Sequence, residues 1–230
     1  MQSYSTTSVR PPDFVEPMKA KLVDSLPSGN WIYEIKFDGY RALALRGGSE
    51  TRVLSRNEKD LGSKFPEVKD SIAALDVHDA IIDGEIVALD EEGRSSFQLL
   101  QSFDMGEDRP PIVFYAFDLL RLNGKDLRDL SIEERKGKLE EMLKNPPGVI
   151  RYSVSFTKDV QELLSRAREL GLEGLIGKRS GSRYEPGKRT GAWIKLKLHQ
   201  EQEFVIGGYT EPEGSRKYFG ALPLASTKAT

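Results

Sequence analysis

The sequence has 230 residues, of which 34 are Lys or Arg, 36 are Asp or Glu and none is Cys. This length suits one substantial domain with at most a small appendage, and the near-balanced charge gives no overall basic field that would indicate nucleic acid. The lack of cysteine excludes disulfide frameworks, zinc fingers and cysteine nucleophiles, and two histidines argue against a His-rich metal site. No apolar run approaches membrane-spanning length, so we expect a soluble, cytoplasmic protein without membrane contact.

Strand patterns dominate the chain. Apolar runs with alternating polarity predict strands at 31–36, 41–46, 51–55, 80–89, 112–120, 148–154, 174–179, 192–198 and 203–209. Both hairpin-length and helix-containing connections join these strands. The sequence therefore predicts an α+β fold with antiparallel or mixed sheets.

Three amphipathic patterns between the strands predict helices at 63–75, 131–143 and 159–170. The second begins with capping-box spacing from Ser131 to Glu134, and the third ends at Gly171, a residue suited to a helix C-terminus. These helices would flank the sheets.

The composition changes near the end of the chain. The stretch 178–197 holds seven basic residues and one acidic residue, and the chain after 209 is punctuated by Gly and Pro. Roughly 30 residues are too few to form a hydrophobic core of their own. We therefore expect one domain at 1–200 and a short C-terminal segment at 201–230.

A lysine within a strand-like run, "WIYEIKFDGYRALAL", is the first candidate for chemistry. Side chains alternate across a strand, so Glu34, Lys36 and Asp38 would share one face. The turn signal at Asp38-Gly39 would place Lys36 at the end of the strand, where sites are commonly built. The simpler alternative is a solvated strand face.

Four more strand-like segments carry charged residues: Asp83 and Glu85 in "IIDGEIV", Asp118 in "FYAFDLL", Glu173 before "GLIGK", and Lys195 with Lys197 in "WIKLKL". Each alone is compatible with a structural ion pair or an exposed face. Five such segments in one chain are harder to dismiss, because a charge buried in a strand must be paired or functional.

These residues fit one chemistry together. A lysine amine is a nucleophile only when it is deprotonated, and nearby cations such as Arg41, Lys195 and Lys197 would favour that form. The same cations would neutralise a polyphosphate, while Glu85 and Glu173 would hold Mg²⁺ or ribose hydroxyls. An aromatic such as Phe117 would stack on a base. The residues indicate metal-assisted nucleotidyl transfer to a lysine, with a Schiff-base lysine enzyme as the alternative.

The chain resembles ATP-dependent DNA ligases and their nucleotidyltransferase relatives. "KFDGYR" is similar to motif I of that family, "LSRNEKDL" to motif Ia, "DGEIVALD" to motif III, "FYAFDLL" to motif IIIa, "EGLIGK" to motif IV and "WIKLKL" to motif V. All six occur in family order across 34–197. The stretches "SFQLLQ" and "FVIGGYTEPEGSR" most resemble the ligase module of bacterial non-homologous end-joining ligases.

The resemblance implies a fold and a set of roles. The fold is an ATP-grasp-like nucleotidyltransferase domain of antiparallel or mixed sheets flanked by helices. Lys36 would attack the α-phosphate of ATP to give lysyl-AMP. The remaining implied roles are adenine recognition by Glu34 and the backbone around Ile35, stacking by Phe117, ribose and phosphate contacts by Arg41 and Glu85, metal binding by Glu173 and Glu85, AMP-phosphate contacts by Lys195 and Lys197, and a nick 5′-phosphate contact by Arg56.

The implied activity is DNA ligation, with ATP as AMP donor and Mg²⁺ or Mn²⁺ as metal. The implied substrate is nicked or broken duplex DNA, and the implied partners are end-joining repair proteins. The protein would be a monomer associated with the nucleoid. The alternatives are an RNA ligase or capping-type nucleotidyltransferase, and an inactive DNA-end-binding fragment. The chain after 200 resembles the start of an OB-fold without motif VI. In the family, motif VI orients the pyrophosphate of ATP, so the resemblance implies that AMP loading and full nick sealing depend on it more than sealing of a pre-adenylylated nick does. We expect a truncated or naturally shortened form.

Overall fold

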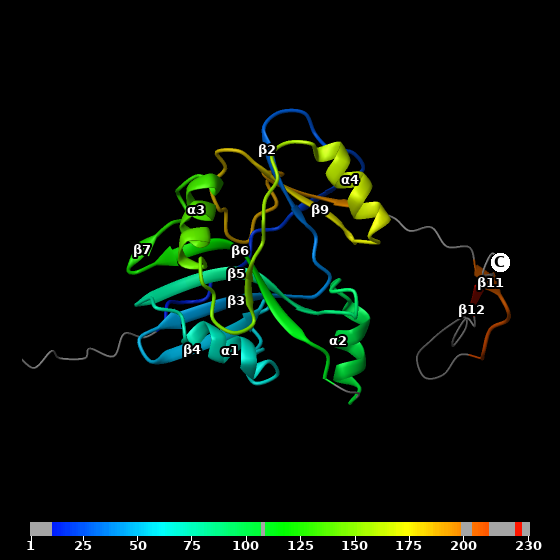
Figure 1. The fold of residues 1–230 in the computed structure, drawn as a ribbon, viewed down its shortest axis with the longest axis horizontal. Coiled ribbons are helices and arrows are strands. Elements are labelled where there is room, and N and C mark those ends of the chain that lie inside the picture. The colour runs from blue at the N-terminus through cyan, green and yellow to red at the C-terminus, as the bar shows by residue number, and fades with distance from the viewer. Residues whose placement is uncertain (1–10, 107–108, 199–203, 212–223, 227–230) are drawn as a thin grey trace, which may run out of the picture. The chain divides into compact units, whose positions relative to one another are not determined.

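The structure is a computed structural model that describes residues 11–106, 109–198, 204–211 and 224–226. The chain divides into two units, Met1–Leu198 and His199–Thr230, which are described separately. Figure 1 shows that the described part of the first unit has two sheets with helices packed around them. This arrangement confirms the predicted α+β class with mixed sheets.

The larger sheet has the strand order β4-β3-β5-β6-β7, with β8 also paired to β6. Its strands are β3 (Tyr40–Gly47), β4 (Glu50–Ser55), β5 (Asp79–Ala88), β6 (Ile112–Leu122), β7 (Lys125–Asp126) and β8 (Ile150–Tyr152). The neighbours pair antiparallel except for β8, which runs parallel to β6. The register places Arg41 opposite Glu85, which brings two predicted site residues side by side.

Both faces of the larger sheet are buried. Successive residues of β3 belong in turn to the core on one face and to the core on the other. Ala42 and Ala44 face one core together with Phe65, while Leu43 and Leu45 face a second core on the opposite side. Small residues on one face and large residues on the other follow from the two-residue period of a strand.

The smaller sheet has the order β1-β10-β9-β2. Its strands are β1 (Lys21–Val23), β2 (Trp31–Ile35), β9 (Gly174–Arg179) and β10 (Trp193–Lys197). β9 pairs antiparallel with both β2 and β10, whereas β1 runs parallel to β10. Predicted motifs far apart in the sequence, at 31–36, 174–179 and 192–198, are thereby made neighbours in one sheet.

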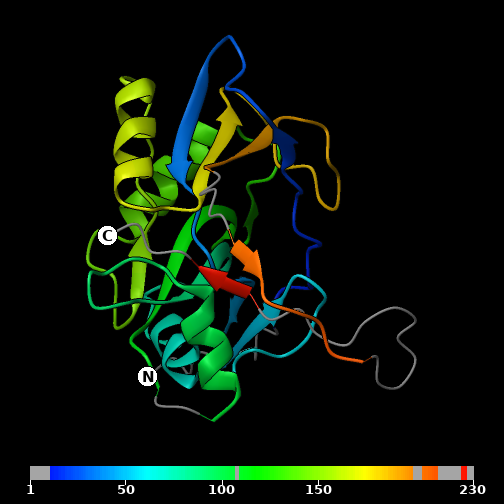
Figure 2. The same cartoon turned by 90° about the vertical axis from the view of Figure 1, so that its right-hand side faces the viewer.

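Four helices are present in the described residues: α1 (Pro66–Ala73), α2 (Phe97–Asp104), α3 (Ile132–Met142) and α4 (Val160–Glu169). Figure 2 shows α4 beside the smaller sheet, while α1 and α2 pack on the larger one. The predicted capping box of α3 forms, and Gly171 takes the left-handed conformation after α4. Neither α2 nor strands β1, β7 and β12 were predicted.

The second unit is described only in part. β11 (Phe204–Ile206), which lies in the predicted strand 203–209, pairs antiparallel with β12 (Leu224–Ser226). The boundary at 200 and the identity of 201–230 as the start of an OB-fold remain predictions. In the portions of the chain that the structure describes, no helix has the length and apolar character needed to span a bilayer.

Gly39, in the bend between β2 and β3, allows a close approach of two backbone segments. A Cβ at this position would lie 2.2 Å from the carbonyl oxygen of Ile86 in the central strand β5. We expect Gly39→Ala to lower the free energy of unfolding by about 1–3 kcal/mol, because β5 cannot move away easily. In α3, a Cβ at Gly137 would meet nothing within 4 Å, so Gly137→Ala should stabilise the chain instead. Urea denaturation followed by circular dichroism measures both changes, and equal effects would contradict the packing argument.

Candidate active site

One cavity of about 480 Å³ is lined from both sheets. β2 contributes Glu34 and Ile35, and β9 and β10 contribute Lys178 and Lys195 among others. The larger sheet contributes Arg41, Glu85 and Phe117, and 16–20 in the N-terminal segment completes part of the wall. Most of the residues predicted to form a site therefore share one cavity.

Lys36 lies at this cavity directly after β2 ends at Ile35. Its backbone N–H donates to the carbonyl of Gly174 at 2.9 Å, and its Nζ forms an ion pair with Glu173. Both side chains are partly buried. The prediction that Lys36 sits at a strand end is confirmed. The predicted alternation does not continue to Asp38, because the chain leaves the strand and Asp38 accepts a hydrogen bond from the N–H of Phe97.

Arg41 is held by a buried carboxylate. Its Nε and one terminal nitrogen donate to the oxygens of Asp83 at 3.0 and 2.6 Å. The hydroxyl of Tyr184 also donates to Asp83, at 2.7 Å, and accepts from the N–H of Met18 at 2.9 Å. Burial lowers the pKa of Arg41, but Asp83 outweighs burial and the net shift is upward. This network fixes a permanent cation in the wall and ties the N-terminal segment to it.

Glu85 lies on β5 opposite Arg41. Burial raises the pKa of Glu85 to about 8, an effect that Arg41 and Lys36 oppose and that Asp83 and Glu173 reinforce. Gly84 beside it has no room for a side chain, since a Cβ there would lie 2.4 Å from the ring of Phe114. Gly84 thus lets the ring of Phe114 and the backbone of β6 come close to β5.

This shift predicts a pH dependence of stability in the nucleotide-free chain. The ordinary pKa of Glu85 is 4.5, so between about 4.5 and about 8 the folded state binds more protons than the unfolded state. The contribution of Glu85 to stability therefore falls as pH rises through this window. We expect urea denaturation to show the wild type losing stability relative to Glu85→Gln from pH 5 to about pH 8. Parallel curves for the two chains would contradict the prediction.

Glu34 is almost fully buried although it lines the cavity. Its Oε1 accepts from Lys136 Nζ at 3.0 Å and pairs with Lys178 Nζ at 2.8 Å, and its Oε2 accepts from the Ser153 hydroxyl at 2.9 Å. Burial alone would raise the pKa of Glu34, but the two ammonium groups outweigh it and the net shift is downward. Glu34 is therefore an ionised acceptor with a fixed orientation.

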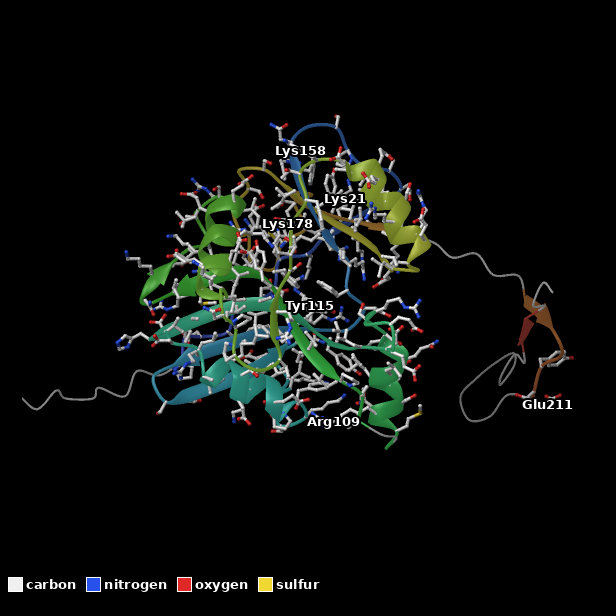
Figure 3. All side chains as sticks on the ribbon, in the orientation of Figure 1. Lys21, Arg109, Tyr115, Lys158, Lys178 and Glu211 are labelled. Atoms are coloured by element: carbon white, nitrogen blue, oxygen red, sulfur yellow. The ribbon has the colours of Figure 1, made fainter. Side chains whose placement is uncertain are left out.

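Lys178 of β9, labelled in Figure 3, lines the cavity and connects the two sheets through its side chain. Besides pairing with Glu34 of β2, its Nζ donates to the carbonyl of Phe117 in β6 at 2.8 Å. The ammonium lies 4.9 Å from the ring centre of Phe117 and 4.5 Å from that of Trp193. Burial lowers the pKa of Lys178, and Glu34 opposes that shift. Phe117, predicted to stack on a base, thus has its ring fixed by cations and by Trp193.

Lys195 adds positive charge near Lys36. Burial lowers the pKa of Lys195, and the charges of Lys36, Lys197 and Arg189 lower it further. These cations repel one another, and a bound polyphosphate would offset that repulsion with its negative charge.

The structure brings together most, but not all, of the predicted site residues. Glu34, Ile35, Lys36, Arg41, Arg56, Glu85, Phe117 and Lys195 line the cavity. Glu173 reaches the cavity through its ion pair with Lys36. Lys197 is exposed at the end of β10, opposite Gly174, and is not part of the lining. No role was predicted for Lys136, Ser153 or Tyr184, because nothing in the sequence around them distinguishes them from other polar residues.

The predicted metal ligands are Glu85 and Glu173. The described residues contain no group of three or more Asp, Glu, His or Cys side chains that could hold a metal ion. Two carboxylates still suit Mg²⁺, because that ion is commonly held by one or two carboxylates together with substrate phosphates and water. The site therefore fits a metal that arrives with a phosphate-bearing substrate.

The mixed sheets and the lysine-centred cavity define a nucleotidyltransferase-type domain. The family model described as "ATP dependent DNA ligase domain" matches residues 13–197. The chain belongs to this family.

Relatives and solved structures agree with this assignment. The chain is 44% identical over 215 residues to the multifunctional non-homologous end joining protein LigD of Pseudomonas aeruginosa, covering 93% of this chain and 25% of that protein. It is 35% identical over 216 residues to DNA ligase C1 of Mycolicibacterium smegmatis, covering 87% and 61%. A structure of mycobacterial DNA ligase D complexed with ATP and MES aligns with a TM-score of 0.71 at 32% identity, covering 91% and 67%. The chain thus spans about a quarter of the length of the LigD proteins it matches.

Proposed function

We propose that this chain transfers AMP from ATP to Lys36 and then to the 5′-phosphate of a DNA break. The observation that carries the proposal is the placement of Lys36 Nζ, which an ion pair with Glu173 holds at a cavity lined by Arg41 and Lys195. An amine that lies among other cations is suited to attack a phosphate whose negative charge those cations offset. Membership of the ATP-dependent DNA ligase domain family supports ATP as the donor.

The chemistry has three balanced steps. The neutral amine of Lys36 attacks the α-phosphorus of ATP, a P–N bond forms, pyrophosphate leaves and one proton is released. A 5′-phosphate oxygen of DNA then attacks the same phosphorus, which breaks the P–N bond and frees the amine. The 3′-hydroxyl finally attacks the activated 5′-phosphate, AMP leaves, and the strand is joined.

The other predicted residues have roles compatible with their positions. Phe117 and Glu34 would contact the adenine, Arg41 and Glu85 the ribose and phosphate, and Lys195 the AMP phosphate. Lys197, which is exposed at the end of β10, would also contact the AMP phosphate. The backbone of Ile35 would meet the adenine edge.

Glu85 and Glu173 would hold a divalent metal, Mg²⁺ or Mn²⁺. Such an ion supplies charge neutralisation at the phosphates when bound. The raised pKa of Glu85 fits a carboxylate whose charge would be stabilised by a divalent cation in the cavity.

Nicked or broken duplex DNA is the proposed acceptor. Arg56 lies at the cavity and is exposed, so it would meet the 5′-phosphate as DNA approaches. Relatives named as non-homologous end joining proteins support double-strand break repair as the setting and end-joining proteins as partners.

A labelling assay tests the proposal. The chain is incubated with Mg²⁺ and either α-labelled ATP or α-labelled GTP, and a nicked duplex with a 5′-phosphate is then added. We expect label from ATP, and not from GTP, first on the protein and then on DNA, followed by sealed product. Label from GTP would favour a capping-type enzyme, and transfer only to RNA nicks would favour an RNA ligase. No protein label together with no sealing of a pre-adenylylated nick would overturn the enzymatic proposal.

A further inference from the structure

The carboxylate of Glu34 has more cationic partners than one negative charge requires. Lys136 and Lys178 both contact its Oε1, at 3.0 and 2.8 Å, and the Ser153 hydroxyl contacts Oε2 at 2.9 Å. Only 2% of Glu34 is exposed, yet the residue lines the cavity. Two ammonium groups and a hydroxyl are more than is needed to neutralise one buried carboxylate. The extra contacts therefore point to a role in fixing the orientation of Glu34.

Counting acceptor sites shows what Glu34 offers to a ligand. An ionised carboxylate has about four lone-pair sites and no hydrogen to donate. Lys136 and Lys178 occupy the two sites on Oε1, and Ser153 occupies one site on Oε2. The remaining site is on Oε2, and it can only accept a hydrogen bond.

Lys136 is held firmly in its position on α3. Its Nζ also donates to the carbonyl of Ser153 at 2.6 Å and lies 4.4 Å from the ring centre of Tyr152. Its neighbour Arg135 makes two hydrogen bonds to buried Asp118 of β6, which fix α3 on the larger sheet. Lys136 is buried and is absent from the cavity lining, so it acts on a ligand only through Glu34.

We propose that Lys136 is a positioning residue that sets base selection, by holding Glu34 so that its free acceptor site faces the C6 substituent of a purine. A 6-amino group donates to this acceptor, whereas a 6-oxo group presents a second acceptor and is rejected. This inference rests on the proposed function for the placement of a purine beside Glu34. Beyond the residues that would contact the nucleotide, the inference assigns Lys136 on α3 a part in determining which purine is accepted.

The test compares Lys136→Met with Lys138→Met. The first variant removes one ammonium and leaves Glu34 paired with Lys178 alone, one charge against one, so the core keeps no unpaired ion. The second removes an exposed lysine of the same helix. Lys136→Arg keeps the charge and the donor, and Ser153→Ala removes the other constraint on the carboxylate.

Calorimetric titration with ATP and with inosine triphosphate, a 6-oxopurine nucleotide, is done without divalent metal so that only binding is measured. We expect the wild type and Lys138→Met to prefer ATP by about tenfold or more, because the 6-oxo group leaves a charged acceptor unpaired. In Lys136→Met the preference should fall to about threefold or less, Lys136→Arg should restore part of it, and Ser153→Ala should shift it in the same direction as Lys136→Met.

Three outcomes would overturn the inference: no preference in the wild type, an unchanged ratio in Lys136→Met, or equal weakening of both nucleotides, which is the mark of a merely structural role. If Lys136→Met does not fold, the same criteria apply to Ser153→Ala. A wild type that discriminates in binding but never carries AMP would refute the proposed transfer and leave base selection standing.

Discussion

Lys36→Ala is expected to lose ATP-dependent nick sealing by at least about a thousandfold, because the substitution removes the amine that would carry AMP. The cavity is lined by three other amines, those of Lys19, Lys178 and Lys195. Lys178 is buried and already hydrogen-bonded to Phe117 and paired with Glu34, so it is a poor substitute. The measurement is denaturing electrophoresis of a labelled nicked duplex incubated with ATP and Mg²⁺.

A nick that is already adenylylated separates the loss of AMP transfer to the protein from any loss of the sealing step. A nick that already carries AMP on its 5′-phosphate needs no lysine nucleophile, so Lys36→Ala should still seal it at a measurable rate. Lys125→Ala, which removes an exposed lysine on β7, serves as the matched control and should behave as the wild type on both substrates. ATP-dependent sealing by Lys36→Ala at near wild-type rates would refute the assigned role.

Asp118→Leu is expected to cost about 3–5 kcal/mol of the free energy of unfolding, because it leaves the guanidinium of Arg135 buried without its carboxylate. Both side chains are fully buried and share two hydrogen bonds, at 2.8 and 2.9 Å. The same guanidinium also donates to the carbonyls of Leu130 and Ser182, which joins α3 to the loop before β10. A loss of this size is a large share of the stability of a typical domain.

A double-mutant cycle isolates the pair. Asp118→Leu with Arg135→Met replaces both charges with apolar groups and should be far less destabilised than the sum of the single variants. Arg166→Met breaks the exposed pair with Glu162 on α4 and should change stability by at most about 0.5 kcal/mol. Urea denaturation gives all the values. Additive single and double effects would show that the two residues do not depend on each other.

Much of the fold follows from local sequence pattern. The apolar runs at 41–46 and around Asp83 and Glu85 predicted β3 and β5, because a strand buried on both faces is apolar along most of its length. Helix α3 was marked by its capping box at Ser131. The two-residue strand β7 has a pattern too brief to stand out. Helix α2, which packs against β5, was not predicted although it is as long as α1.

The candidate site was predictable to the extent that charges in strands are conspicuous. That criterion found Lys36, Glu85 and Glu173, and the structure places them together. It did not find Lys136, which lies on an ordinary polar helix and becomes distinctive only when the fold buries it against Glu34. Nor did it predict that Tyr184 would join Asp83 to the N-terminal segment, since that contact spans most of the chain.

Whether Lys36 itself carries AMP can be read from the mass of the chain. The chain is incubated with ATP and Mg²⁺, its intact mass is recorded, and the AMP-bearing peptide is located by tandem mass spectrometry after digestion at neutral pH. We expect one AMP per chain, on the peptide that contains Lys36 and nowhere else. AMP on a peptide containing Lys178 or Lys195, or a chain that seals nicks from ATP without ever carrying AMP, would contradict it.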